Sequence, residues 1–328
     1  MSDRRRVAIV VHATVPGDPR IQRQADALTD AGYEVDVLCL RRPGEVGQET
    51  AGTQRIVRLP LDRSVSGFAG HMAEYVAFAA MATWQLAMEH RHRRYDVVQV
   101  ANVPDFLAMA ALPEKLAGVP LLLDLHEDMP EFFRDRFAHP WLRPLLPVVV
   151  AATRASAALA DALITVHEPL RQLSIGRGVD PDRISVVMNS ADPRIFDPAR
   201  HERRPFMADG RLRLIHHSNL QRLYGLDVAI DGLTRLSQEL DWQLDVYGDG
   251  PWRPQVDAAI ARNDAADRVL LHGRVPLEEL PAKLAAADIG LVPSRHEPYL
   301  EYSLSTKLLE FAAMGVPIVA TDLATFRH

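Results

Sequence analysis

Residues that could bind an anion stand close together near position 305. The stretch STKLLEFAAMGVPIVAT, residues 305–321, is expected to form a helix that ends at Gly315 before a short strand. Its start carries two hydroxyls and Lys307, and its first turns carry a single acid, Glu310. A helix N-terminus has unpaired N–H groups and a positive partial charge, which suit a diphosphate. Hydroxyls add donors and a lysine adds a point charge, so this segment is a candidate anion site.

Other polar residues follow short apolar runs that are expected to be strands. In the first half these are His12 and the residues after it, Asn102, and the run DLHEDMPE. In the second half they are HHSNLQR, YGDG, HGR and PSRHEPYLEY. The carboxyl ends of parallel strands lie at one edge of a sheet, where open α/β folds usually bind ligands. Caps and turns need similar residues, so for each run alone both explanations stay open.

The apolar runs alternate with helical patterns, which predicts two doubly wound α/β domains. VAIVVHA, YEVDVLCL, RIVRLPL, DVVQVA, PLLLDLH, ALITV and ISVVMN are short and almost continuously apolar, as strands buried on both faces are. The pattern resumes in LRLIHHS, WQLDVYG, RVLLHGR, DIGLVPS and PIVAT. We therefore expect a first domain over 1–190, a linker over 191–210 and a second domain over 211–328. Two such Rossmann-like domains usually face a cleft that holds the ligand.

Composition favours a soluble globular protein over a nucleic-acid-binding protein or a membrane span. The 328 residues carry a formal net charge of −6, so an electrostatic attraction to nucleic acid has no basis. The most apolar long stretch contains Arg154 and Asp161 and is interrupted by Pro144 and Pro147, so we expect no span there. The single cysteine, Cys39, offers no disulfide framework, and a cytoplasmic location is expected.

Several segments, in their order and spacing, resemble the retaining, nucleotide-sugar-dependent glycosyltransferases of family four. In the second half the resemblance is carried by SNLQRLYGLD, VYGDGP, LHGRV, ADIGLVPS and STKLLEFAAMGVPIVA. In the first half it is carried by DPRIQRQADAL, LDLHE and VVMNSAD. The resemblance covers nearly the whole chain. It implies the GT-B arrangement of two Rossmann-like domains, with the donor bound by the second.

The resemblance implies a metal-independent hexosyltransferase that moves a sugar from a nucleoside-diphosphate sugar to an acceptor hydroxyl. The work would belong to cell-surface polysaccharide or glycolipid synthesis, and the acceptor would be a sugar or a lipid-linked sugar. The nucleotide sugar is then a substrate, and neither a cofactor nor a metal is expected. Residues 66–94 and 131–146 combine apolar with basic side chains. They could rest on the inner face of a membrane or simply pack on the core.

In the second domain the resemblance assigns Glu310 to both ribose hydroxyls, because a carboxylate offers two acceptors to a vicinal diol. Without the resemblance, Glu310 is equally an ordinary first-turn acid favoured by the helix dipole. Lys307 and Arg222 are the candidate diphosphate ligands, Arg222 because Tyr224 stands where the family usually has a lysine. Tyr302 stands where the family usually has a further glutamate. The remaining nucleotide-sugar contacts are Ser303, Leu304, Ser305, Thr306, Gly248, Gly250, Gly273 and Arg274.

In the first domain the resemblance places His126 close to the sugar and the α-phosphate, as a catalytic residue with Arg222 and Lys307. His12, Gly17 and Asp18 are expected to shape the acceptor side. Asp18 could instead cap a helix that begins near residue 20.

Members of the family normally continue beyond the point where this sequence stops. We therefore expect an incomplete second domain with exposed apolar surface. Two alternatives remain: an inactive nucleotide-sugar-binding module, or a GT-B sugar-nucleotide epimerase. A nicotinamide-dependent oxidoreductase is disfavoured, because the first strand runs into HATVPGDP rather than into a G-x-G-x-x-G loop.

Overall fold

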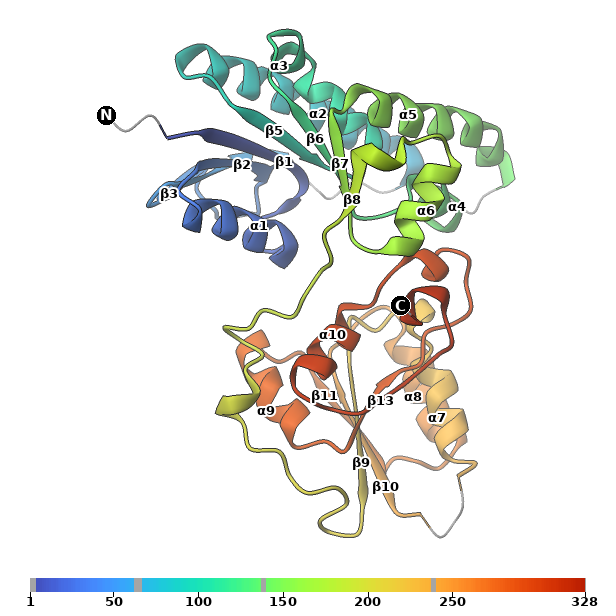
Figure 1. Ribbon diagram of the computed structural model, residues 1–328. Coiled ribbons are helices and arrows are strands. Elements are labelled where there is room, and N and C mark those ends of the chain that lie inside the picture. Colours follow the sequence, from blue (N-terminus) through green and yellow to red (C-terminus); the bar gives the residue numbers. More distant parts are fainter. Residues whose placement is uncertain (1–3, 62–66, 137–139, 237–239, 328) are drawn as a thin grey trace. The chain divides into compact units, whose positions relative to one another are not determined.

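The computed structural model describes residues 4–61, 67–136, 140–236 and 240–327, and the chain divides into two compact units (Figure 1). Unit 1 covers Met1–Met188 and unit 2 covers Asn189–His328. Each unit is a sheet of mostly parallel strands with helices packed on it, which confirms the predicted α/β fold class. The segment 191–210, expected as a linker, packs on unit 2 through the buried side chain of Phe196.

Unit 1 contains an eight-stranded sheet in the order β3-β4-β2-β1-β5-β6-β7-β8. Only the pair β3–β4 is antiparallel. The strands are β1 (Arg6–Thr14), β2 (Glu34–Leu40), β3 (Gln48–Ala51), β4 (Gln54–Leu59), β5 (Val97–Ala101), β6 (Leu121–Leu125), β7 (Ala162–Thr165) and β8 (Ile184–Val186). The helices are α1 (Pro19–Asp30), α2 (Gly67–His92), η1 (Asp105–Ala111), α3 (Leu112–Leu116), α4 (Met129–Arg136), η2 (Pro140–Leu145), α5 (Leu146–Leu159), α6 (Glu168–Gly176) and η3 (Pro181–Arg183).

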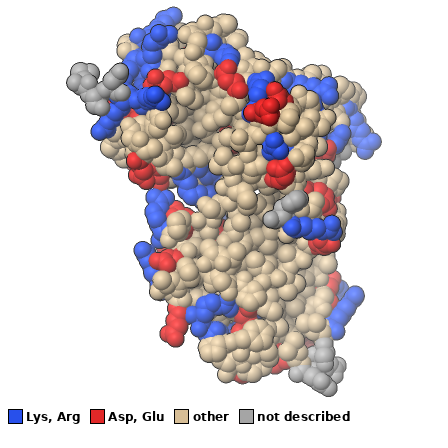
Figure 2. Space-filling view, viewed as in Figure 1, with Lys and Arg blue, Asp and Glu red and all other residues tan. Residues whose placement is uncertain are grey.

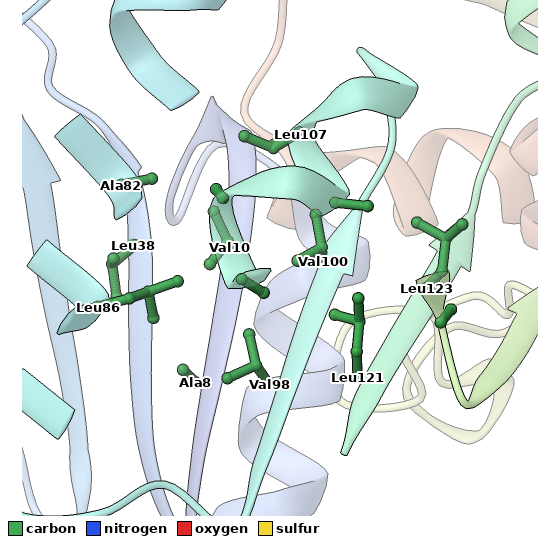
Figure 3. Packing of buried hydrophobic residues seen from close by; sticks show 14 of the residues in the cluster. Ala8, Val10, Leu38, Ala82, Leu86, Val98, Val100, Leu107, Leu121 and Leu123 are labelled. Atoms are coloured by element: carbon green, nitrogen blue, oxygen red, sulfur yellow. The ribbon is translucent and has the colours of Figure 1, made fainter. Parts of the chain in front are cut away.

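Alternate residues of β1 explain why this sheet is covered on both faces. Ala8 and Val10 belong to the core beneath α2, η1 and α5, whereas Ile9 belongs to the core beneath α1. Successive side chains of a strand point to opposite faces, so a continuously apolar strand needs helices on both sides. Figure 3 shows the larger core, where side chains of β1 and its neighbours meet those of α2 and η1.

Unit 2 contains a five-stranded parallel sheet in the order β11-β10-β9-β12-β13. The strands are β9 (Leu212–His217), β10 (Trp242–Tyr247), β11 (Val269–Gly273), β12 (Ile289–Val292) and β13 (Ile318–Ala320). The helices are η4 (Pro198–Arg200), η5 (Arg222–Tyr224), α7 (Leu226–Leu233), α8 (Arg253–Arg262), η6 (Leu277–Glu279), α9 (Leu280–Ala285), η7 (Leu300–Tyr302), α10 (Thr306–Ala313) and η8 (Ala324–Phe326). Helices α7 and α8 cover one face, and α9 and α10 the other.

Three elements differ from the sequence prediction. The strand β3 was not predicted, because its four residues QETA are exposed and mostly polar. The helical pattern of residues 103–118 forms a 3-10 helix, η1, followed by the short α3, which has Pro113 as its second residue. The helical pattern of residues 226–240 forms a helix only as far as Leu233, and residues 237–239 lie outside the described residues.

Candidate functional site

The N-terminus of α10 carries a polar atom without a partner. Ser305 occupies the cap position in extended conformation, but its side chain makes no capping hydrogen bond. Its Oγ is buried and finds no hydrogen-bond partner among the described residues. A buried hydroxyl without a partner costs free energy. The first turn of α10 is therefore ready to donate hydrogen bonds to an acceptor from outside the chain.

Lys307 adds a buried cation to the same turn. Its side chain is only 9% exposed, and its Nζ lies 4.0 Å from the centroid of the Tyr224 ring. No carboxylate among the described residues forms an ion pair with this ammonium. Burial lowers the pKa of Lys307 to about 8, although the charge of Glu310 works in the opposite direction. A buried cation that lacks an anion is costly, so a bound phosphate would stabilise this site.

The contact with Tyr224 explains a departure from the family pattern. The resemblance leads us to expect a lysine at position 224, on the loop after β9. The structure has an aromatic ring there, and the cation reaches that ring from α10 instead. A ring face attracts a cation and holds it without neutralising its charge. Sequence reasoning missed this role of Tyr224, because nothing in the local sequence links positions 224 and 307.

Glu310 lies one turn after Lys307 on α10 and faces the end of β9. Its Oε2 is 3.3 Å from Nε2 of His217, close enough to interact although not aligned for a hydrogen bond. Burial, together with the charge of Lys307, lowers the pKa of His217 to about 3, so this imidazole is neutral. The ring of His217 also packs edge-on against Phe311, at 5.2 Å between centroids. His217 therefore lies against the carboxylate of Glu310, a contact that the sequence suggested only through the place of His217 at a strand exit.

The glycines predicted to contact the nucleotide sugar have different surroundings. A Cβ on Gly248 would lie 1.8 Å from the carbonyl oxygen of Ser218, and one on Gly250 would lie 2.4 Å from that of Leu220. These glycines are thus required for the loops after β9 and β10 to pack together. A Cβ on Gly273 would meet nothing within 4 Å. Of these three glycines, Gly273 alone has open space at its Cβ position.

Arg222 is half-exposed on η5, and Glu297 holds it. Its Nη2 donates to Oε1 of Glu297 at 2.8 Å. Arg295 lies beside it, with Nε 2.9 Å from the carbonyl oxygen of Arg222 and Nη2 2.6 Å from Asp227. Arg274 is exposed after β11. An exposed ion pair contributes only about 0–1 kcal/mol, so Arg222 can exchange Glu297 for a phosphate at little cost.

The loop between β12 and α10 holds the other predicted contacts. Ser303 and Leu304 precede the cap residue Ser305, and Thr306 begins the helix. Glu301, the nearest acid to Tyr302, accepts a hydrogen bond from the backbone N–H of Ala324 at 2.8 Å. Glu301 thus already has a structural partner.

In unit 1, His126 follows β6 and is fixed by a carboxylate. Its Nε2 lies 2.8 Å from Oδ2 of Asp124, and both side chains are buried. The same oxygen accepts from the amides of Gln24 at 2.8 Å and Gln99 at 3.1 Å. An ionised carboxylate only accepts, so Nε2 of His126 carries a proton and Nδ1 is the nitrogen left for another partner. Sequence reasoning found His126 and the run that contains Asp124, but not Gln24 and Gln99, which hold Asp124.

Asn102, at the end of β5, ties the His126 loop to η1. Its Oδ1 accepts from the backbone N–H of His126 at 2.8 Å, and its Nδ2 donates to Asp105 at 2.9 Å. Burial raises the pKa of Asp105 to about 6, against the hydrogen bonds from Thr153 and Asn102. Asp105 also lines a cavity of about 330 Å³ beside α5 and α6. The backbone around His126 is thus fixed by the buried hydrogen-bond network of Asn102, Asp105 and Thr153.

The three residues expected on the acceptor side have clear structural roles. Asp18 is the N-cap of α1, accepting from the backbone N–H of Arg20 at 3.0 Å, which agrees with the alternative explanation for this residue. Burial would raise the pKa of Asp18, but the hydrogen bond and charge of Arg20 outweigh it and lower the pKa. A Cβ on Gly17 would clash with Thr14. His12 is buried, with Nε2 3.1 Å from Glu74. The loop around Gly17 and Asp18 lines a hollow of about 280 Å³.

Within the described ranges, no group of three or more His, Cys, Asp or Glu side chains is placed to hold a metal ion. His216 bonds the carbonyl oxygen of Leu291 at 2.9 Å and Oγ of Ser218 at 2.8 Å. His167 caps α6 by accepting from the backbone N–H of Leu170.

Comparison with known protein families shows the family to which this chain belongs. Residues 17–190 match the family described as glycosyl transferase 4-like domain, and residues 211–328 match glycosyl transferases group 1. The chain belongs to the glycosyl transferase 4-like family. The resemblance predicted from the sequence is thereby confirmed, and so is the glycosyltransferase class.

Relatives and solved structures agree with this glycosyltransferase assignment. The 2-deoxystreptamine glucosyltransferase of Streptomyces kanamyceticus is 27% identical over 92% of this chain and 79% of its own length. Sucrose-phosphate synthase of Thermosynechococcus elongatus has a similar fold, with a TM-score of 0.73 and 16% identity over 98% of this chain and 82% of its own. Anabaena HepE, solved with UDP and glucose, has a TM-score of 0.65 and 15% identity. The match covers 98% of this chain and 82% of the HepE chain. The fold is therefore the GT-B arrangement.

Proposed function

We propose that this glycosyltransferase moves a sugar from a nucleoside-diphosphate sugar to an acceptor hydroxyl, with retention at the anomeric carbon and without a metal ion. Unit 2 would hold the donor, with the diphosphate at the N-terminus of α10 and the ribose on Glu310. His126 of unit 1 would contact the transferred sugar through Nδ1. No cofactor is required, because the nucleotide sugar is itself a substrate.

The observation that carries this proposal is a pair of donor groups at the start of α10, of which the hydroxyl of Ser305 has no hydrogen-bond partner among the described residues. The ammonium of Lys307 is buried against a ring rather than a carboxylate, and Oγ of Ser305 is buried without a partner. The ammonium can only donate and the hydroxyl can also donate, so an anion is a partner that could accept from both groups. A diphosphate satisfies both at once, in the field of a helix N-terminus. The solved neighbour with bound UDP supports a nucleoside diphosphate as that anion.

The proposed reaction needs no dedicated base. The bond between the anomeric carbon and the phosphate oxygen breaks, and its electron pair stays on the phosphate. Lys307, Arg222 and the N–H groups of α10 stabilise that charge while the sugar becomes oxocarbenium-like. The acceptor oxygen then bonds to the anomeric carbon from the face that the phosphate leaves. Its proton passes to the departing phosphate oxygen, so the atoms and charges balance.

The proposed acceptor is a hydroxyl of a sugar or a lipid-linked sugar in cell-surface polysaccharide or glycolipid synthesis, in the cytoplasm. A small aminocyclitol is a second candidate. The relative from S. kanamyceticus, which matches over 92% of this chain, is named for a 2-deoxystreptamine acceptor.

Transfer assays in the presence of a chelator test the proposal. The chain is incubated with UDP-, ADP-, GDP- and dTDP-sugars and with monosaccharide, 2-deoxystreptamine or lipid-linked acceptors. We expect a glycoside with the anomeric configuration of the donor, identified by NMR. Inversion would refute retention, and a need for added magnesium or manganese would refute metal independence. A changed sugar nucleotide without glycoside would indicate an epimerase, and binding without any turnover an inactive module.

A further inference from the structure

One layer of helices in unit 1 turns apolar side chains outward. The helices α2, η1, α3 and α5 pack on the same side of the sheet, with η1 in contact with both α2 and α5 (Figure 1). Their inner faces form the larger core of the unit. The outer face of this layer, which we call the helical face, carries the exposed side chains of Val76, Trp84, Leu116, Trp141, Leu145 and Val148.

The α5 part of the helical face reverses the usual pattern of a surface helix. Within residues 140–159, η2 followed by α5, a stretch of 18 residues has a mean hydropathy of 1.3, yet only 17% of it is buried. Trp141 and Val148 are 67% and 65% exposed, and Leu145 lies between them at helical spacing. A surface helix normally turns polar residues outward. Here the outward stripe is apolar.

The same segment is fixed along the surface of unit 1. Oγ of Ser156 donates to the carbonyl oxygen of Asp105 at 2.8 Å, and Ala157 and Ala160 belong to the core. The helix α5 therefore packs along η1. A segment held in this way can present its outer stripe to a bilayer.

The helix α2 extends the apolar surface. Val76 and Trp84 are 60% and 68% exposed on one side of it, whereas Phe78 and Leu86 are fully buried on the other. Its last turn is basic, with Arg91 exposed. Tryptophan beside a cationic helix end is the combination found at membrane interfaces.

Charge on the helical face has one sign. The acids of these described helices are turned inward: Glu74, Asp105 and Glu114 are buried, and Glu89 is bound by Arg6 and Arg55. The exposed charges are basic, as on Arg91, Arg143 and Arg154. Figure 2 shows mainly tan and blue atoms along the upper margin of unit 1, where these helices lie in Figure 1. This asymmetry is notable in a chain whose net charge is −6.

We propose that the helical face docks on the headgroup region of a bilayer that contains anionic lipid. Apolar and tryptophan side chains enter the boundary between headgroups and acyl chains, and the arginines meet lipid phosphates. A second copy of the chain fits this face less well, because a two-fold contact would set arginines against arginines. The inference does not depend on the transfer reaction.

Co-sedimentation of the full chain with lipid vesicles tests the proposal. We expect binding to vesicles of phosphatidylcholine with about 30% phosphatidylglycerol, and weak binding to phosphatidylcholine alone or at high salt. The variant Trp141→Gln/Val148→Gln should bind the anionic vesicles at least about tenfold more weakly, because both side chains leave the interface. Arg143→Gln/Arg154→Gln should reduce the preference for anionic lipid.

A matched control changes exposed apolar residues elsewhere. Phe206 and Val228 of unit 2 are 61% and 51% exposed, so Phe206→Gln/Val228→Gln should leave vesicle binding unchanged. The proposal is overturned if the wild-type chain stays in the supernatant with every vesicle. It is equally overturned if the unit 1 variant and the control bind alike. A dimer in lipid-free solution that only the unit 1 variant disrupts would identify a second copy as the partner instead.

Discussion

Lys307 links anion binding to pH. Its pKa of about 8 reflects burial without an anion, and a bound diphosphate would raise it again. Above pH 8, binding must therefore take up a proton, and the affinity for a nucleoside diphosphate should fall by up to about tenfold per pH unit. Calorimetry at pH 7, 8 and 9 measures this slope. The variant Lys307→Met should show weak binding without the slope, and an equal slope in both proteins would contradict the role of Lys307.

The free energy of unfolding of the ligand-free protein should rise with pH, whereas the affinity for the diphosphate falls. The pKa of Lys307 is lowered from 10.5 in the unfolded chain to about 8, so the unfolded state binds more protons between these values. Unfolding free energy therefore rises with pH across that window. Denaturant unfolding of the wild type and Lys307→Met at pH 7.5 and 9.5 measures it. The difference between the two proteins in the increase of unfolding free energy from pH 7.5 to 9.5 is the contribution of Lys307.

Glu310 should contribute to binding through the ribose alone. The change Glu310→Gln removes a charged acceptor and should weaken a nucleoside diphosphate by about 1–3 kcal/mol. Inorganic pyrophosphate, which has no ribose, should lose no affinity in the variant. The exposed Glu278 supplies the control Glu278→Gln. An unchanged nucleotide affinity in folded Glu310→Gln would remove Glu310 from the site.

Asp124 should act on turnover rather than on donor binding. Its carboxylate fixes the proton on Nε2 of His126, and Asp124→Asn weakens that contact by the scale of a charged hydrogen bond, about 1.5–3 kcal/mol. We expect kcat to fall roughly tenfold or more, while the affinity for nucleoside diphosphate, which we propose to bind to unit 2, stays the same. Nitrogen NMR of the imidazole checks the tautomer directly. Wild-type protein with the proton on Nδ1 would refute the positioning role.

At the scale of elements, the close approach of the loops after β9 and β10 depends on Gly248. Both Gly248 and Gly273 have positive φ, 124° and 72°, so alanine strains the backbone at either position. Only at Gly248 would the new Cβ also meet a carbonyl oxygen, at 1.8 Å. We expect Gly273→Ala to cost about 1 kcal/mol and Gly248→Ala roughly 2–4 kcal/mol of unfolding free energy. If denaturant titrations gave the same loss of unfolding free energy for Gly248→Ala and Gly273→Ala, the loops would be able to move apart around the new Cβ.

Most elements could be predicted because their sequence and their burial agree. The strand β1 is apolar at every position from Val7 to Val11 and is buried on both faces, so its sequence pattern is unambiguous. The strand β3 pairs only at an edge and is exposed, so it carries no apolar signal. The segment 105–111 has helical composition, but sequence does not distinguish a 3-10 helix from an α-helix there.

The candidate site could be predicted only where local sequence determines the role. Lys307 and Ser305 belong to the start of one helix, and their order alone indicates an anion site. The role of Tyr224 depends on a contact across 83 positions, and Asp124 depends on Gln24 and Gln99 from other elements. Asp18 had two possible roles in sequence, and the hydrogen bond from Arg20 places it as a cap.

At the scale of the whole molecule, the two units have separate cores, so a donor nucleotide should stabilise one of them. A ligand at about 100 times its Kd contributes about 2.7 kcal/mol to the unit that binds it. Hydrogen exchange with bound nucleoside diphosphate should slow in α10 and in the loops after β9 and β10. Exchange in α2 of unit 1 should not change. Protection that appears only in unit 1 would contradict the proposal that the nucleotide binds to unit 2.

The central claim is that the first turn of α10 binds the diphosphate of the donor. Calorimetric titration of the full chain with the best nucleoside diphosphate and with its nucleoside measures what the diphosphate contributes. We expect the wild type to prefer the diphosphate form by at least about 30-fold, because a buried charged hydrogen bond contributes about 1.5–3 kcal/mol and more than one forms. Lys307→Met should lose most of that preference and keep the affinity for the nucleoside. The same preference in the wild type and the variant would contradict the claim.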